Sequence, residues 1–325
     1  MTTQGEVLAE LFEGDGHTVF RSSTRLSPVG RALDHARDLF VWRDQIDVVI
    51  VSVFSGRAFA LADESLTLAR ALRLPSVAWM HGGDLPSLGK QHPRWTRRVL
   101  RTADSVVAPT AYLARWAQES VDSVGVIPNV LDLSTYAYRE RTGLRPHLLW
   151  MRTFHELYDP ACAVRVLAEL RSRGVDAELT MAGQDKGLLA ATRELAAELG
   201  VGSSIRFPGF VSGADKTALF DAHDFFLNTN VVDNAPVTVL EAAASGLAVV
   251  STDAGGVPDL LAGGEAAILV SPGDPSAMAD AVRRLLEQPA LAVHLARAAR
   301  GVAERSAWPT VRDQWLRCFE HDPLR

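Results

Sequence analysis

The chain of 325 residues is longer than one hydrophobic core usually supports, so two domains are expected. Hydrophobic residues make up 47% of it and charged residues 22%, which excludes a disordered or a disulfide-rich protein. Its formal net charge of -6 argues against a nucleic-acid-binding protein, because such proteins usually carry an excess of Lys and Arg.

Strands and helices are expected to alternate along the first half of the chain. The run from Val48 to Val51 is apolar at every position, as in a strand buried on both faces of its sheet. The alternation predicts an α/β fold in which helices cover both faces of a parallel sheet. The expected strands are residues 17–22, 47–54, 76–81, 105–109 and 124–128.

The same alternation resumes in the second half, after a stretch without strand character. That stretch, residues 133–145, is the expected linker between the two domains. The first helix after it can be capped by Asp159, with Pro160 in its first turn. The expected strands of this half are residues 147–152, 178–182, 205–208, 225–229, 248–252 and 267–270.

The last helical region carries more aromatic surface than a free helix would expose. It includes Trp308, Trp315 and Phe319, so we expect it to pack back onto the molecule. The expected organisation is a first domain of residues 1–140, a second of residues 141–305, and a C-terminal helix in residues 306–325 that docks toward the first domain.

The most specific pattern in the sequence is a loop, helix, strand and Gly-Gly turn in residues 233–256. Pro236 fits the first position of the helix, so the backbone N–H groups that follow it should lack partners and favour a phosphate. Those groups belong to Val237, Thr238 and Val239. Glu241 follows about one turn later, where its carboxylate can accept two hydrogen bonds from a ribose diol. Any βαβ unit contains a helix start and can contain a Glu, so these two features alone do not indicate a nucleotide site. The spacing of the acidic residues is more specific.

Asp233 and Glu241 have seven residues between them, followed by small residues and the Gly255-Gly256 turn. This spacing resembles the signature of the retaining glycosyltransferases of family 4, and the resemblance covers nearly the whole chain. It implies the GT-B architecture, two Rossmann-like domains with parallel sheets and the donor cleft between them. It also implies that Glu241 binds the nucleotide ribose and that Asp233 contacts donor-sugar hydroxyls. The residues expected to line the sugar and diphosphate are Asn234, Ala235, Pro236, Val237, Thr238 and Val239. The family more often has Glu where Asp233 stands, so the donor sugar stays open.

Two further stretches carry the same resemblance. Arg152 matches the diphosphate-binding arginine of the family, whereas Leu157 or Tyr158 stands where the family has a lysine. His81 lies at the carboxyl end of an expected parallel strand, where ligands of such sheets bind, and is implied as a contact of the donor sugar. The candidate acceptor-side groups are Gly82, Gly83 and Asp84. An ion pair with a surface carboxylate is the alternative for Arg152, and a buried structural role is the alternative for His81.

These residues predict a glycosyltransferase that moves a sugar from a nucleotide diphosphate sugar to an acceptor hydroxyl with retention, in glycan, polysaccharide or glycolipid synthesis. The implied catalytic residues are His81, Asp233 and Arg152. No metal or cofactor is expected, because Arg152 and the helix after Pro236 can stabilise the leaving diphosphate. A dinucleotide oxidoreductase is excluded, since no Gly-x-Gly-x-x-Gly follows the first strand. A nucleotide-sugar epimerase and a non-catalytic nucleotide-sugar-binding subunit stay open as alternatives.

The cellular context is expected to be the cytoplasm. The chain shows no signal peptide or spanning segment, and the spacing of Cys162 and Cys318 suggests neither a disulfide nor a metal site. A helical stripe of arginines could contact the inner membrane face and so suit a lipid-linked acceptor, although a solvated helix face is the alternative. Its members are Arg94, Arg97, Arg98 and Arg101.

The beginning of the chain departs from the family. Family members open with an apolar strand and a glycine-rich loop, whereas here residues 2–5 lead directly into a helix over residues 6–13. In the strand order 3-2-1-4-5-6 the first strand is central. We therefore expect either a translation start assigned too far downstream or a chain with a gap in its first sheet, low stability and little activity.

Overall fold

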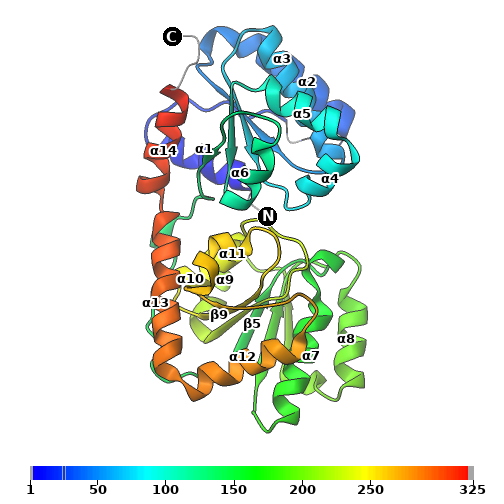
Figure 1. Ribbon diagram of the computed structural model, residues 1–325, viewed down its shortest axis with the longest axis vertical. Coiled ribbons are helices and arrows are strands. Elements are labelled where there is room, and N and C mark those ends of the chain that lie inside the picture. Colours follow the sequence, from blue (N-terminus) through cyan, green and yellow to red (C-terminus); the bar gives the residue numbers. More distant parts are fainter. Residues whose placement is uncertain (1–2, 24, 26, 321–325) are drawn as a thin grey trace. The chain divides into compact units, whose positions relative to one another are not determined.

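The computed structural model describes residues 3–23, 25 and 27–320, and the chain divides into two compact units (Figure 1). Unit 1 consists of Met1–Val130 and Trp308–Arg325, and unit 2 of Leu131–Ala307. Both units contain a parallel sheet covered by helices, so the fold is α/β, as the sequence predicts.

The described part of unit 1 contains a sheet of four parallel strands in the order β1-β2-β3-β4. The strands are β1 (Val49–Val53), β2 (Ser76–Met80), β3 (Ser105–Ala108) and β4 (Gly125–Val126). One face of the sheet packs against α3, α5 and α6, and the other against α1 and α14. The helices are α1 (Gln4–Gly14), α2 (Pro28–Trp42), α3 (Arg57–Ala71), α4 (Leu85–Gln91), α5 (Pro93–Thr102), α6 (Ala111–Gln118) and α14 (Trp308–Glu320).

Helix α1 forms because its start is capped and one of its sides is apolar. The Thr3 hydroxyl accepts from the backbone N–H of Glu6, and the Glu6 carboxylate accepts from the N–H of Thr3. Leu8 and Phe12, spaced by one turn, are buried against β2 and β3. Trp315 of α14 packs on the same face and is fully buried, with its ring 5.1 Å from that of Trp79.

Two strand predictions in unit 1 are wrong in whole or in part. Residues 17–22 are not a strand, although Thr18, Val19 and Phe20 have high strand propensity. The segment pairs with no strand of the described residues, and the Phe20 ring instead stacks on Trp42 at 4.7 Å. The strand expected in residues 124–128 is reduced to the two residues of β4.

The described part of unit 2 contains a sheet of six parallel strands in the order β10-β9-β8-β5-β6-β7. Numbered from β5, this is the doubly wound order 3-2-1-4-5-6, which reverses direction between β5 and β8. The strands are β5 (His147–Met151), β6 (Glu178–Ala182), β7 (Ile205–Gly209), β8 (Phe225–Asn228), β9 (Ala248–Thr252) and β10 (Ile268–Val270). Ligands of such sheets bind at the carboxyl ends of the strands beside that reversal.

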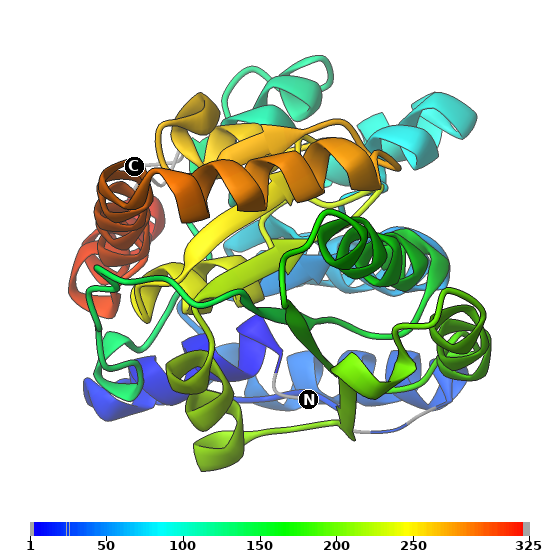
Figure 2. The same ribbon diagram turned by 90° about the horizontal axis from the view of Figure 1, so that it is seen from below.

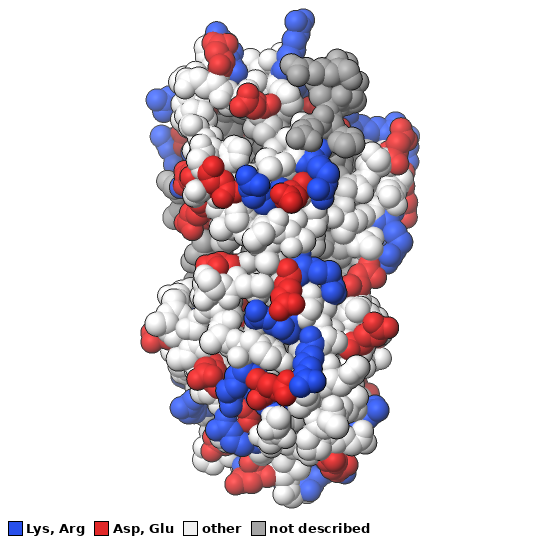
Figure 3. Space-filling model, turned by 90° about the vertical axis from the view of Figure 1, so that its left-hand side faces the viewer, with Lys and Arg blue, Asp and Glu red and all other residues white. Residues whose placement is uncertain are grey.

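Helices cover both faces of the unit 2 sheet (Figure 2). Helices α7, α8 and α12 pack on one face, and α10 and α13 pack on the other. The helices are α7 (Pro160–Ser172), α8 (Leu189–Glu198), α9 (Gly213–Ala222), α10 (Val237–Ala244), α11 (Val257–Leu260), α12 (Pro275–Glu287) and α13 (Pro289–Arg305). On the face of the molecule in Figure 3, acidic and basic side chains are interspersed. Elsewhere in unit 2, exposed Arg297 pairs with Glu140 at 2.6 Å.

The segment expected as a linker is anchored by a buried carboxylate of unit 2. Asp224, which is 1% exposed, pairs with Arg141 at 3.2 Å and with Arg145 at 2.9 Å. Arg141 is itself buried and also donates to the carbonyl oxygens of Phe220 and His223. A buried charge must be paired in this way to remain buried, so this segment is held firmly against β8.

Candidate functional site

The loop between β8 and α10 brings the predicted acidic motif to the carboxyl edge of the unit 2 sheet. Its conformation depends on the Gly-Gly turn, because the N–H of Gly256 donates to the carbonyl oxygen of Asp233 at 3.1 Å. A Cβ atom on Gly255 would lie 2.0 Å from that same oxygen. The glycines of the motif are therefore needed for close backbone packing against Asp233.

Helix α10 begins one residue later than the sequence predicts. Pro236 is the N-cap residue and not the first helical residue, and its carbonyl accepts from the N–H of Val239 at 3.1 Å. The expectation of a free N–H at Val239 is therefore wrong. Among the described residues, the N–H groups of Val237 and Thr238 have no protein partner. These two groups and the helix dipole can bind an anion.

Glu241 lies on α10 with one carboxylate oxygen engaged and the other without a partner. Its Oε1 accepts from the hydroxyl of Tyr136 at 2.7 Å and pairs with the ammonium of Lys216. Its Oε2 is buried and has no hydrogen-bond partner among the described residues. A buried carboxylate oxygen without a donor is costly, so this atom is poised to accept from a ligand.

Tyr136 and Lys216 are functional candidates that sequence reasoning missed. Tyr136 follows the short turn Leu133–Thr135, and Lys216 lies on α9, so neither is near Glu241 in sequence. Burial and the nearby Glu241 carboxylate raise the pKa of Tyr136, which keeps its hydroxyl protonated as a donor. Folding brings these two donors to the same carboxylate, and no spacing in the sequence predicts that contact.

Arg152 and Asp233, predicted separately, lie in contact with each other. Arg152 follows β5, and its guanidinium pairs with Asp233 Oδ2 and lies over the ring of Tyr158, 4.7 Å from its centroid. Burial lowers the pKa of Arg152 to about 10, so the group stays charged at neutral pH. Asn230, another residue that the sequence did not reveal, donates to the same Asp233 oxygen. A carboxylate therefore does pair with Arg152, and it belongs to the site itself.

The loop that carries Arg152 packs closely against Gly183, the residue that follows β6. A Cβ atom on Gly183 would lie 1.7 Å from the carbonyl oxygen of Arg152. The N–H of Arg152 donates to the carbonyl of Ala182 at 3.1 Å. Leu157 and Tyr158, which stand where a lysine is expected, are close by, and the carbonyl of Leu157 accepts from the N–H of Val231. They fix the loop before α10 but supply no cation.

His81 and the residues after it lie in unit 1, at the carboxyl end of β2. Burial lowers the pKa of His81 to about 3, so the imidazole is neutral, and its Nε2 has no partner among the described residues. The ring stacks on Phe54 at 4.9 Å. Gly82 is in close contact with the chain, since a Cβ atom there would lie 3.0 Å from the N of Ser55. Gly83 is half-buried and Asp84 is exposed, at the start of α4.

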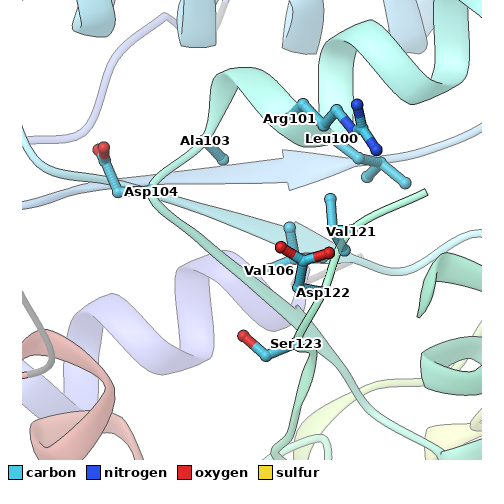
Figure 4. A pocket seen from close by; sticks show the side chains of 8 residues that line it. All are labelled: Leu100, Arg101, Ala103, Asp104, Val106, Val121, Asp122 and Ser123. Carbon is cyan, nitrogen blue, oxygen red and sulfur yellow. The ribbon is translucent and has the colours of Figure 1, made fainter. Parts of the chain in front are cut away.

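The arginine stripe of α5 is only partly free. Arg98 pairs with Asp63, and Arg101 donates to the carbonyl of Ser120 at 2.7 Å. Trp95 donates to Asp63, and Val99 is fully buried, so the apolar side of the helix packs inward. A pocket of about 470 Å³ is lined by Arg101, Asp104 and Asp122 among others (Figure 4). None of the predicted catalytic, donor-binding or acceptor-side residues lines it. In the part of the chain that the structure describes, no helix is long and apolar enough to cross a membrane.

The sequence of the chain matches two family models and several characterised proteins. Residues 8–135 match the sequence model of Glycosyltransferase Family 4, and residues 145–288 match that of Glycosyl transferases group 1. The glycogen synthase of Mycobacterium tuberculosis is 26% identical over 309 residues, which are 88% of this chain and 69% of that protein. The phosphatidyl-myo-inositol mannosyltransferase of Mycolicibacterium smegmatis is 29% identical over 270 residues, 79% of this chain and 67% of that protein.

Solved structures share the fold at low sequence identity. Anabaena HepE in complex with UDP-glucose has a TM-score of 0.76 at 18% identity, covering 97% of this chain and 89% of that one. The sucrose-phosphate synthase of Thermosynechococcus elongatus has a TM-score of 0.77 at 14% identity, covering 97% and 92%. The parallel α/β units have the GT-B fold, and the sequence matches show that the chain is a glycosyltransferase. The chain belongs to glycosyltransferase family 4.

Proposed function

We propose that this enzyme transfers a sugar from a nucleotide diphosphate sugar to an acceptor hydroxyl with retention of the anomeric configuration. The observation that carries the proposal is the buried Oε2 of Glu241, which lies on the helix that begins with the N–H groups of Val237 and Thr238; none of these three groups has a partner among the described residues. A ribose hydroxyl can donate to Oε2, while Tyr136 and Lys216 hold the other oxygen and fix the carboxylate in place.

The diphosphate of the donor suits the start of α10 and Arg152. The N–H groups of Val237 and Thr238 can donate to phosphate oxygens, and a guanidinium can bridge two of them. In the structure Arg152 pairs with Asp233, so a bound diphosphate would replace Asp233 as a partner of the guanidinium. Asp233, released from Arg152, can then accept from a hydroxyl of the donor sugar.

The transfer step can proceed on one face of the sugar. The bond between the anomeric carbon and the diphosphate oxygen breaks, and the acceptor oxygen bonds to that carbon from the same side. The acceptor proton passes to the departing diphosphate oxygen, so no protein nucleophile is required. Arg152 and α10 stabilise the charge that develops on the diphosphate, and no metal ion or cofactor is part of the proposed mechanism. His81 stays a proposed contact of the donor sugar, with Gly82, Gly83 and Asp84 on the acceptor side.

A UDP-sugar is a reasonable first donor, because HepE, which shares the fold, has been solved with UDP-glucose. A lipid-linked acceptor is suggested by the name of the mannosyltransferase relative. Cytoplasmic location and contact with anionic lipid through the arginines of α5 belong to the same proposal. Flotation with neutral and anionic vesicles tests the lipid contact. Equal recovery on the two kinds of vesicle, or recovery on neither, would refute it.

The experiment that tests the function is incubation with UDP-, GDP- and ADP-sugars, with and without acceptor glycans or glycolipids. A transferase releases nucleoside diphosphate from one donor class, and faster with the right acceptor. A nucleotide-sugar epimerase would return a modified nucleotide sugar without that release. A non-catalytic subunit would bind the donor and leave it unchanged. Family membership favours neither alternative.

A further inference from the structure

The guanidinium of Arg152 is held by two protein groups besides Asp233. One is the ring of Tyr158, whose centroid lies 4.7 Å from the central guanidinium carbon. A cation this close to the face of an aromatic ring is attracted to it electrostatically. The other is the side chain of Asn230, whose Oδ1 accepts from Nε of Arg152 at 3.4 Å. Nη1 of Arg152 makes no hydrogen bond to any of the described residues.

Both groups are anchored just after β8. The hydroxyl of Thr229 donates to the backbone carbonyl of Tyr158 at 2.6 Å and accepts from the indole N–H of Trp150 at 2.8 Å. Asn230 is the next residue of the chain, and its carbonyl accepts from the hydroxyl of Thr252 at 2.6 Å. Thr229 and Asn230 are both fully buried. Two neighbouring residues therefore fix the contacts on the face and at the Nε edge of the guanidinium.

These contacts leave the terminal nitrogens of Arg152 for a ligand. Asp233 occupies Nη2, where the diphosphate of the proposed function would replace it. Asn230 can still hold Nε after that exchange and Tyr158 can still cover the face, so the guanidinium need not reorient. A long arginine side chain otherwise loses rotamer freedom when it binds a phosphate, and that loss weakens binding. Holding the side chain in advance reduces the loss.

We propose that Tyr158 and Asn230 are positioning residues, which hold the Arg152 guanidinium so that Nη1 and Nη2 face the diphosphate. This role rests on the proposed function, in which Arg152 binds that group. In this way one arginine can act without the lysine that is expected where Leu157 or Tyr158 stands. The aromatic ring adds no charge, but it fixes the position of the charge that is present.

The test measures binding of UDP and GDP by calorimetric titration of the full chain and its variants. Tyr158→Leu removes the aromatic face and should raise the Kd of whichever nucleotide the wild type prefers by about 2- to 30-fold. Tyr158→Phe keeps that face, so its affinity should equal that of the wild type. Equal affinities of the two variants would show that the ring only fills space, and would overturn the proposal.

Asn230→Ala removes the acceptor for Nε of Arg152. It should raise the same Kd by about 2- to 12-fold, since 3.4 Å is long for a hydrogen bond to a charged group. Asn228→Ala is the matched control, because Asn228 is equally buried but donates to Ser251, and its Kd should equal that of the wild type. Circular dichroism checks the folding of each variant. Tyr158→Met or Asn230→Ser takes the place of a variant that is unfolded.

Arg152→Gln shows whether both residues act through Arg152. This variant should itself bind the nucleotide weakly, and Tyr158→Leu or Asn230→Ala added to it should change the Kd by less than about 2-fold. Full effects of these substitutions in the Arg152→Gln background, or wild-type affinity of either single variant, would overturn the positioning role alone. Wild-type affinity of Arg152→Gln, or a wild type that binds neither nucleotide, would overturn the diphosphate site of the proposed function and this role with it.

Discussion

Arg152 and Asp233 form an ion pair that joins the end of β5 to the loop before α10. The pair links the two strands between which the order of the unit 2 sheet reverses, where ligands of such sheets bind. In the proposed function both residues exchange this contact for contacts with the donor. The charges that fix the shape of the site are thus the same charges that would bind the donor.

Replacing Asp233 should separate binding from transfer. Asp233→Ala frees Arg152 for the diphosphate, so nucleotide affinity should be equal to or higher than that of the wild type, while sugar transfer is lost. Calorimetric titration with nucleoside diphosphates and an assay of product formation measure the two effects. Persistent turnover would show that Asp233 does not contact the reacting sugar.

Tyr136 should strengthen nucleotide binding without touching the nucleotide. Tyr136→Phe keeps the ring against Phe220 but removes the hydrogen bond to the Glu241 carboxylate. Such a bond to a charged group is worth about 1.5–3 kcal/mol, and because Lys216 still holds the same oxygen, nucleotide binding should lose only part of it, about 0.5–1.5 kcal/mol. The Kd for the nucleotide should rise by roughly 2- to 12-fold. Tyr138→Phe is the matched control, because that ring lies beneath Arg300 and makes no bond to Glu241. Equal effects of the two variants would remove Tyr136 from the site.

Gly183 should be essential for the position of Arg152. In Gly183→Ala the new methyl group would overlap the Arg152 carbonyl, so the chain must shift, at a cost of about 2–3 kcal/mol in the free energy of unfolding. Gly202→Ala, whose nearest contact would be 3.8 Å away, is the control and should cost much less. Urea unfolding gives both values. A Gly183→Ala protein as stable as the wild type would contradict the close packing seen here.

His81 should make stability depend on pH. Its folded pKa of about 3 lies below the ordinary 6.5. Between these two pH values the imidazole is protonated in the unfolded chain and neutral in the folded chain. This lowers the free energy of unfolding as the pH falls from about 6.5 toward 3, by about 1.4 kcal/mol at pH 5.5. His81→Phe should lose this dependence, because no group titrates there. Urea unfolding at pH 5.5 and 7.5 compares the two proteins, and equal pH dependence would show that His81 is not responsible.

The sequence predicts most strands because their apolar runs are continuous, and a continuous run needs burial on both faces. It fails at residues 17–22, where strand propensity is high but the part of the chain that the structure describes offers no strand to pair with. The acidic motif predicts a helix that carries Glu241, since Asp233, Pro236 and the glycines encode local backbone geometry, but α10 begins one residue later than expected. The contacts of Glu241 with Tyr136 and Lys216 could not be predicted, because they depend on packing between elements far apart in sequence.

The most direct test of the proposed nucleotide site is calorimetric titration of the wild type and Glu241→Ala with UDP and GDP. Loss of the charge-assisted hydrogen bond to the ribose, about 1.5–3 kcal/mol, should weaken binding of the preferred nucleotide by roughly 10- to 150-fold. Glu198→Ala, an exposed glutamate at the end of α8, is the control and should bind like the wild type. Circular dichroism confirms that both variants are folded at the titration temperature. Unchanged affinity of folded Glu241→Ala for the nucleotide that the wild type binds would contradict the assignment of this site.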